Sequence, residues 1–176
     1  MLTPDPARKL PAPKEGTGVK AFPMDRGLFA LTNAEPFYAR VPLVKTRVTL
    51  TRAFDKLVYR DGYGKDGQYL LLDGFGRGRH YRYDTNAILR LTADDRVFLV
   101  GTDDDQRVAE TYHNTLSFIR DGRGHDHVPP FAASEAIADF PHTSFSSSTV
   151  HDYSGLKWTR NITWLRRSLF VVIDHV

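Results

Sequence analysis

The sequence contains no cysteine, which excludes disulfide bonds and metal sites built on thiolates. It has no apolar run near the roughly 20 residues that a membrane-spanning helix needs. Its first residues lack the apolar core of a signal peptide. The sequence has no large excess of either positive or negative charge, since the formal net charge is +3 over 176 residues. This small excess does not by itself indicate a nucleic-acid partner. No segment shows the 3.6-residue apolar period of a long amphipathic helix.

Short segments with alternating apolar and polar residues make up most of the chain. This alternation is typical of half-buried antiparallel strands. Residues 87–92 and 96–100 flank Ala93-Asp94-Asp95, which predicts a hairpin with a three-residue turn. Residues 132–140 fit a short helix or a strand. The other predicted strands are 44–52, 56–60, 68–73, 111–119, 144–153, 157–165 and 169–174.

Many short strands separated by turn residues predict an all-β protein, a sandwich or a barrel. Residues 1–20 hold four prolines and little apolar content, so we expect a flexible arm or linker there and one β domain over 21–176. The expected core includes Leu50, Val58, Leu71, Leu89, Leu99, Phe118, Trp158 and Val172.

The two ends of the sequence suggest that the chain belongs to a longer architecture. The start resembles a linker, and an apolar strand stands directly at the other end. An exposed strand edge invites aggregation, so such an end favours further structure beside it. The alternative is a terminal strand that is paired inside a sheet.

The stretch 74–86 is the strongest candidate for a binding site. Three arginines, a histidine and two tyrosines fall within the seven residues from Arg77 to Tyr83. Arginine suits carboxylates and sulfates, tyrosine offers a flat face, and the flanking glycines allow close approach of the backbone. The pattern predicts a site for an anionic, ring-shaped ligand. The alternative is a solvated hairpin loop whose charges only keep an edge soluble.

Five short stretches occur in a recognisable order: Asp55-Lys56-Leu57-Val58-Tyr59-Arg60, Gln68-Tyr69-Leu70-Leu71-Leu72-Asp73-Gly74, the loop from His80 to Asn86, Tyr112-His113-Asn114-Thr115 and Asp152-Tyr153-Ser154-Gly155. Together they resemble the C-terminal β-sandwich part of the heparinase II/III-like polysaccharide lyases. The resemblance covers roughly residues 22–176. It implies an antiparallel β-sandwich, action on uronate-containing glycans such as glycosaminoglycans, and a periplasmic or secreted location.

In that family a helical toroid precedes the sandwich, and the two parts enclose the active site. No segment here has the pattern of that toroid. The resemblance therefore implies a separated or truncated sandwich, inactive or weakly active by itself. It implies His80 and Tyr81 as catalytic residues. The expected substrate-binding residues are Arg77, Arg79, Arg82, Asn86, His113 and Asn114.

Family members often hold zinc through a His-x-His-x-Asp loop and a distant histidine. His80 and Asp84 match the ends of that loop, and His113 matches a His-Asn motif. The middle ligand position is Arg82, and no carboxylate stands among residues 99–101, where the further acidic ligand is expected. We therefore predict no zinc cofactor, with the Arg82 guanidinium supplying positive charge in its place.

Several alternatives stay open. The whole chain fits a non-catalytic module that binds acidic polysaccharide or a partner protein. Single-stranded nucleic acid is disfavoured, because no known nucleic-acid-binding motif is present. His113 and Asn114 also fit a buried pair that satisfies backbone groups, and His125 and His127 fit a solvated loop. A hydrolase triad of Ser148, His151 and Asp152 is disfavoured, because the sequence around Ser148 is not that of a nucleophile elbow.

Overall fold

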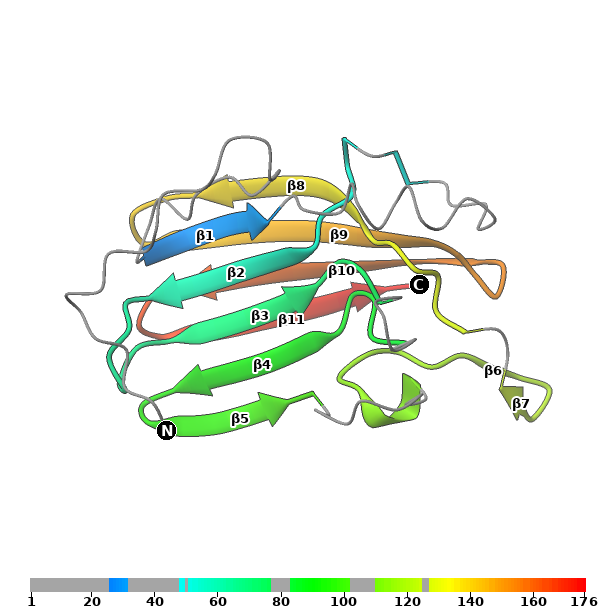
Figure 1. Ribbon diagram of the computed structural model, residues 1–176, viewed down its shortest axis with the longest axis horizontal. Coiled ribbons are helices and arrows are strands. Elements are labelled where there is room, and N and C mark those ends of the chain that lie inside the picture. Colours follow the sequence, from blue (N-terminus) through cyan, green and yellow to red (C-terminus); the bar gives the residue numbers. More distant parts are fainter. Residues whose placement is uncertain (1–25, 32–47, 50, 77–82, 102–109, 125–126) are drawn as a thin grey trace, which may run out of the picture.

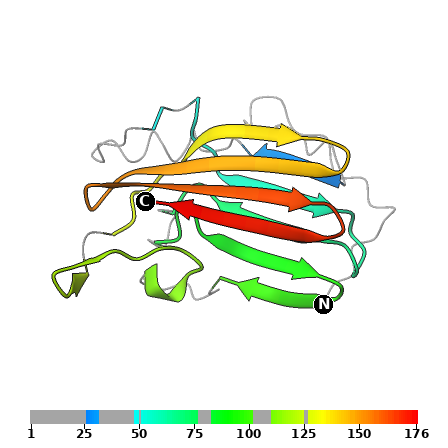
Figure 2. The same ribbon diagram turned by 180° about the vertical axis from the view of Figure 1, so that it is seen from behind.

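The computed structural model of the chain describes residues 26–31, 48–49, 51–76, 83–101, 110–124 and 127–176. A five-stranded antiparallel sheet faces a four-stranded antiparallel sheet (Figures 1 and 2). The protein is therefore an antiparallel β-sandwich, which confirms the predicted class. The expected arm, residues 1–20, lies outside the described residues.

Both sheets are meanders in which each strand pairs with the next along the chain. The first contains β1 (Arg26–Leu31), β2 (Lys56–Asp61), β3 (Tyr69–Asp73), β4 (Ile88–Ala93) and β5 (Arg96–Val100). The second contains β8 (Ala133–Asp139), β9 (Thr143–Tyr153), β10 (Leu156–Leu165) and β11 (Leu169–His175). Along the chain, the segment that connects β5 to β8 contains the 3-10 helix η1 (Glu110–Tyr112) and a small hairpin, β6 (Ile119–Arg120) and β7 (Arg123–Gly124). No helix within the described ranges has the length and apolar character of a membrane span.

The meander connectivity sorts the turns onto two ends of the sandwich. The end of β3, the start of β4, the β9–β10 turn and the segment carrying β6 and β7 lie at one end, which we call the loop end (Figure 1). The β2–β3, β4–β5, β8–β9 and β10–β11 turns lie at the opposite end. The arginine-rich stretch therefore leaves the sandwich at the loop end.

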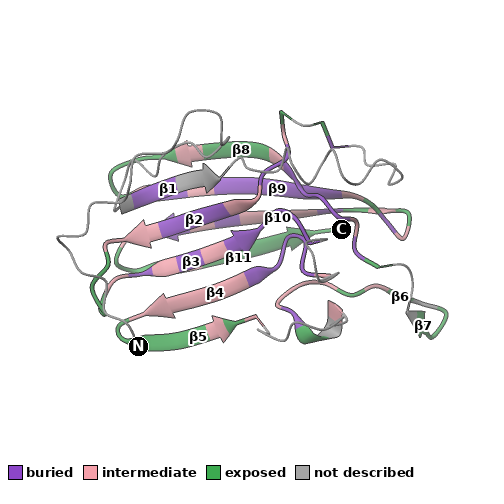
Figure 3. Ribbon diagram, in the orientation of Figure 1, coloured by how far each residue is buried: buried purple, intermediate pink, exposed green. Residues whose placement is uncertain are grey.

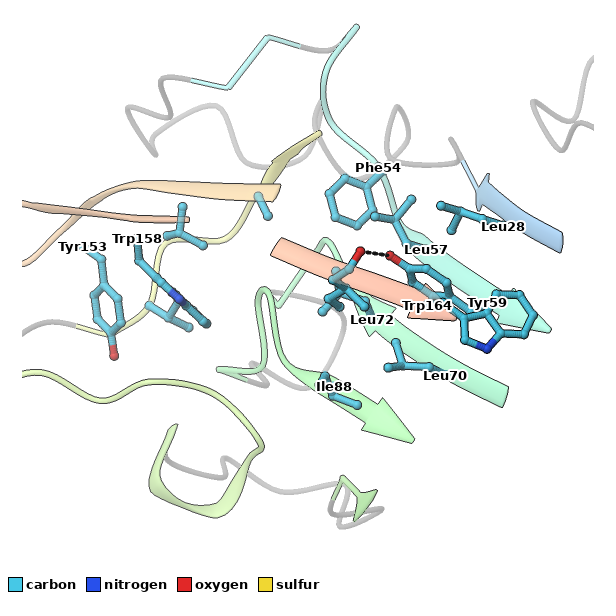
Figure 4. Packing of buried hydrophobic residues seen from close by; sticks show 14 residues of the cluster. Leu28, Phe54, Leu57, Tyr59, Leu70, Leu72, Ile88, Tyr153, Trp158 and Trp164 are labelled. Atoms are coloured by element: carbon cyan, nitrogen blue, oxygen red, sulfur yellow. Dashed lines mark hydrogen bonds between the residues drawn. The ribbon is translucent and has the colours of Figure 1, made fainter. Parts of the chain in front are cut away.

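Aromatic side chains from both sheets fill the space between them (Figure 4). The Trp164 ring stacks on Phe170 at 5.5 Å between centroids and meets Tyr59 edge-on at 6.1 Å. Buried polar tips need partners. The Trp164 Nε1 group donates to Gln68 Oε1 at 2.6 Å, and the Tyr59 hydroxyl pairs with the Ser146 hydroxyl. Burial raises the pKa of Tyr59, so that phenol stays neutral.

The predicted core is correct at two positions, correct only in part at four and wrong at one edge. Val58 and Trp158 are buried. Four of the predicted residues are half-buried, namely Leu71, Leu89, Leu99 and Phe118. Val172 is 38% exposed, because β11 is the edge strand of its sheet and nothing described covers its outer side (Figure 3). Leu50 lies outside the described residues.

The prediction of a strand over 111–119 is wrong. The segment opens with η1, in which His113 N donates to Glu110 O at 3.0 Å, and only Ile119–Arg120 is paired as a strand. Alternating apolar residues do not reveal that the backbone groups of this segment bond to the adjacent Glu110, to Ile88 of β4 and to side chains of β9 and β10. The predicted strand 44–52 also fails at its described end, where Arg52 N and Ala53 N both donate to Thr49 O in a turn.

Two other expectations are refined by the structure. Residues 132–140, open between helix and strand, contain the strand β8. The β4–β5 hairpin has a two-residue turn, Asp94-Asp95, in place of the predicted three-residue turn. Both residues have positive φ, 50° and 57°, as two-residue hairpin turns of the primed type require. Aspartate tolerates this conformation better than most residues.

Candidate functional site

The base of the arginine-rich stretch is held together by backbone hydrogen bonds. Asn86 N donates to Asp73 O at 2.8 Å, and Asp73 N donates to Ala87 O at 2.9 Å. Gly76 N donates to the Thr85 hydroxyl at 2.9 Å. We call residues 73–76 and 83–86 the loop base, since the chain leaves and rejoins the sandwich there. Five predicted site residues, Arg77, Arg79, His80, Tyr81 and Arg82, lie outside the described residues.

Two glycines of the loop base stand where a side chain does not fit. A Cβ on Gly74 would lie 2.3 Å from the carbonyl oxygen of Phe54, and one on Gly76 would lie 2.5 Å from the backbone nitrogen of Thr85. The close approach lets Gly74 N donate to Asp55 O at 2.8 Å. The glycine spacing in this stretch therefore serves dense packing of the loop base.

A buried carboxylate lies under the loop base. Asp73 Oδ1 accepts hydrogen bonds from Phe75 N at 2.8 Å and from Lys56 Nζ at 3.0 Å. Burial, opposed by the Lys56 charge and assisted by the nearby Asp84 charge, raises the pKa of Asp73 to about 7. Burial also disfavours the Lys56 ammonium, but Asp73 and Asp55 together outweigh it and raise the pKa of Lys56. The loop base thus contains a carboxyl group that changes its charge near neutral pH.

The Arg160 guanidinium ties the loop base to the segment that carries the His-Asn motif. Its Nη1 atom donates to Asn86 O at 2.7 Å and to Asn114 O at 3.0 Å. Asp174 orients it by accepting from Nε at 2.9 Å and from Nη2 at 3.0 Å, and also accepts from Trp158 Nε1 at 2.8 Å. One buried cation therefore fixes the relative position of two segments that sequence analysis assigned to the site.

Both predicted asparagines use their side chains inside the fold. Asn86 is fully buried with φ of 62°, and its Oδ1 accepts from the Ser148 hydroxyl at 2.5 Å. Asn114 Nδ2 donates to Ile88 O at 3.0 Å and to Val100 O at 3.3 Å. Asn114 thus satisfies backbone groups, as the structural alternative for the motif proposed. Substrate contact by these side chains stays a prediction.

His113 behaves differently from its neighbour Asn114. It is 9% exposed, and within the described part of the chain neither ring nitrogen has a hydrogen-bond partner. A buried polar group without a partner costs free energy, so His113 is not explained by the satisfaction of backbone groups. Its predicted role in substrate binding stays a prediction.

The candidate hydrolase triad is not assembled. Ser148 and His151 are three residues apart on β9, so their side chains point to opposite faces of the sheet. Ser148 bonds to Asn86 between the sheets, whereas His151 Nε2 lies 3.6 Å from Glu135 Oε1. These residues belong to the scaffold in this arrangement.

The structure also brings together residues that the sequence analysis did not assign to the site. His127 Nδ1 lies 3.0 Å from Glu110 Oε1, and the His127 ring stacks on Tyr83 at 3.7 Å between centroids. Glu110 stands next to the predicted strand 111–119, and His127 was ascribed to a solvated loop. These two residues stand 17 positions apart along the chain, and no periodic signal in the sequence pairs them.

No described group of residues has the composition of a metal site. Across the described ranges, no three His, Asp or Glu side chains gather closely enough to hold a metal ion. The first histidine of the zinc-like motif, His80, lies outside those ranges. At the position of the middle ligand the sequence has Arg82, whose charged guanidinium does not bind a cation. The absence of zinc stays a prediction.

The class of protein that the fold defines is a two-sheet antiparallel β-sandwich. Histidine, glutamate and tyrosine side chains lie around its loop base. Comparison with protein-family models, with curated protein sequences and with solved structures gave no match. The resemblance to heparinase II/III-like lyases therefore depends on the sequence motifs alone.

Proposed function

We propose that the chain is the β-sandwich part of a polysaccharide lyase that cleaves acidic, uronate-containing glycans by β-elimination. One observation carries the proposal: residues 83–86, 110–114 and 127–128 meet at the loop end. Two of these segments adjoin or contain the stretches that resemble the lyase family. Their contact supports a shared site, because residues needed for one reaction have to converge.

The proposed chemistry explains the residue types. β-Elimination removes the proton from the carbon beside the uronate carboxylate and expels the glycosidic oxygen. That carbon is a very weak acid, so the carboxylate has to be neutralised as the enediolate develops. Arg77, Arg79 and Arg82 are proposed to supply positive charge, and His80 and Tyr81 are proposed to transfer protons.

The chain is proposed to act together with a helical toroid, as the resemblance implies. The sandwich alone offers one wall of the substrate site in that arrangement. We therefore expect the 176 residues to bind acidic polysaccharide weakly and to show little or no turnover by themselves.

A second function is favoured by a specific observation. Asn86 and Asn114 use their side chains within the scaffold, and Arg82 replaces the middle residue of the zinc-like motif. Both features suit a sandwich that binds acidic polysaccharide without cleaving it. This module shares the ligand of the lyase and differs from it in turnover.

The test is a panel of polygalacturonate, alginate, hyaluronan and heparin. Binding is measured by titration calorimetry, and cleavage by the ultraviolet absorbance of the unsaturated product. We expect at least one member to bind. Failure of every member to bind contradicts both functions. Robust turnover by the chain alone supports the lyase and contradicts the requirement for a toroid.

A further inference from the structure

A histidine–glutamate pair beside the loop base has the geometry of a proton-transfer site, and the proposal above does not use it. Glu110 Oε1 lies 3.0 Å from His127 Nδ1 and accepts a second hydrogen bond from Val128 N at 2.9 Å. The Glu110 side chain is 12% exposed, whereas that of His127 is 55% exposed. The carboxylate is therefore held inside the fold, and the imidazole extends from it toward solvent.

The pairing selects one tautomer of the neutral imidazole. An ionised carboxylate only accepts hydrogen bonds, so His127 Nδ1 carries the hydrogen that it donates to Glu110. The basic lone pair is then on Nε2, which has no hydrogen-bond partner among the residues that the structure describes. The hydrogen bond to the carboxylate also orients the imidazole so that Nε2 lies on the side of the ring away from Glu110.

The ring of Tyr83 fixes the plane of the imidazole. The two rings stack with 3.7 Å between centroids and 11° between planes. Tyr83 belongs to the loop base, so the stack holds His127 next to the point where the arginine-rich stretch rejoins the sandwich. A hydrogen bond at Nδ1 and a stacking contact on one face leave the ring little rotational freedom.

Tyr153, whose pKa is influenced by the Glu110 charge, does not compete for the proton. Burial, and then the negative charge of Glu110, raises the pKa of Tyr153 to about 12. Its phenol stays protonated at neutral pH and donates to Leu116 O at 3.2 Å. The described partners of His127 are thus one carboxylate and one neutral aromatic ring.

We propose that His127 is a catalytic acid–base residue, with Glu110 and Tyr83 as positioning residues, and this inference rests on the proposed lyase function. Nε2 accepts the proton from the carbon beside the uronate carboxylate, and the electron pair of that C–H bond moves into the enediolate. Collapse of the enediolate forms the carbon–carbon double bond and breaks the bond to the glycosidic oxygen. The imidazolium returns its proton to that departing oxygen, so that charge and atoms balance. In this assignment His127 makes both proton transfers, in place of the proton-transfer roles proposed above for His80 and Tyr81.

The proton-abstraction step can be followed without completion of the cleavage. The full chain is incubated in D₂O with an oligogalacturonate, and deuterium at the carbon beside the carboxylate is measured by proton NMR. We expect incorporation with the wild-type chain and at least a tenfold slower rate with His127→Gln. His142 is exposed on the β8–β9 turn at the opposite end of the sandwich, so His142→Gln serves as the matched control with an unchanged rate.

A second variant separates chemistry from folding. Glu110→Gln keeps an oxygen that can accept from Nδ1 but removes the charge behind the imidazole. We expect slower exchange in this variant, with a thermal midpoint and calorimetric affinity for the oligogalacturonate close to those of the wild type. Exchange unchanged in both His127→Gln and Glu110→Gln overturns the assignment.

The outcomes distinguish the inference from the function on which it rests. Binding of the oligogalacturonate without any deuterium incorporation by the wild type overturns the catalytic role of His127 and leaves the binding function standing. No binding by the wild type, to this probe or to the polysaccharide panel, overturns the proposed function together with the inference. Exchange that is lost in His127→Gln and kept in His142→Gln supports both.

Discussion

The Arg160 guanidinium is the residue on which the geometry of the loop end depends. It is 5% exposed and donates to two carbonyl oxygens and to both carboxylate oxygens of Asp174. Residues 157–165 alternate in burial, and Arg160 shares the buried face of β10 with Trp158, Ile162 and Trp164. The partners of Arg160 were not predictable, because they lie 14, 46 and 74 residues away along the chain.

Replacing Arg160 by Ala tests this dependence. The change leaves a half-buried Asp174 carboxylate and two carbonyls without their donor, so we expect a loss of about 3–5 kcal/mol in the free energy of unfolding. Arg167→Ala is the control, since the Arg167 side chain is 71% exposed in its pair with Asp61. An exposed pair contributes at most about 1 kcal/mol. Equal losses in urea unfolding of the two variants contradict the role given to Arg160.

Asp73 makes stability depend on pH with a defined sign. Its pKa rises from 3.8 to about 7 on folding, so between these values the folded state holds a proton that the unfolded state has released. The stabilisation is complete below about pH 4 and is lost as the pH rises toward 7. Asp73→Asn keeps an acceptor for Phe75 N and removes the titration.

We therefore expect the free energy of unfolding of the wild type to fall, relative to that of Asp73→Asn, between about pH 4 and pH 7. Urea unfolding at a series of pH values measures the difference. The exposed Asp66, changed to Asn, is the control and leaves the pH profile of the wild type unchanged. A constant difference between wild type and Asp73→Asn across this range contradicts the assignment.

At the scale of elements, the sequence predicted hairpins well and connections poorly. β2, β3, β9, β10 and β11 fall where alternation or turn residues indicated extended chain, whereas β8 lies in a segment that the sequence left open between helix and strand. Alternation reports one buried face, which is a local property that strands carry in their sequence. Residues 111–119 alternate too, but their backbone groups bond to Ile88 of β4 and to side chains of β9 and β10, and no local pattern records such distant partners.

The edge strand β11 shows a further limit of the pattern. Its apolar residues predicted burial, but Val171, Val172 and Ile173 are 38–50% exposed on an edge of the sandwich (Figure 3). Side chains on both faces of this strand are accessible, and its outer edge has no neighbour among the described strands. An apolar edge of this kind favours strand-to-strand association.

Ile173→Lys tests the behaviour of this edge. Because Ile173 is 50% exposed, we expect a change of no more than about 0.5 kcal/mol in the free energy of unfolding. The added charge opposes edge pairing, so self-association measured by analytical ultracentrifugation falls. Ile162→Lys is the contrasting variant, since Ile162 is fully buried on the neighbouring strand and its replacement unfolds the protein. If self-association of Ile173→Lys equals that of the wild type, the edge of β11 does not mediate strand-to-strand association.

At the scale of the whole molecule, the two meanders bring the loop base and the β9–β10 turn to the same end of the sandwich. The ordered motifs predicted a β-sandwich, and the structure has one. Glu110 pairs with His127, and the His127 ring stacks on Tyr83. Both contacts depend on the path of the chain that connects the two sheets. That path is fixed by long-range contacts, so the sequence alone did not predict these residues as part of the site.

The most direct test of the account is the affinity of the chain for acidic polysaccharide at low and at physiological salt, measured for the wild type and three variants. Exposed charges are screened within about 8–10 Å at physiological ionic strength, so we expect binding to weaken as salt is added. Arg79→Ala and Arg82→Ala should each weaken it by about 1.5–3 kcal/mol if each arginine makes one charge-assisted hydrogen bond. Lys14→Ala, in the expected arm, should leave it unchanged. Equal losses at Arg79, Arg82 and Lys14 contradict a localised site and leave only diffuse electrostatic attraction.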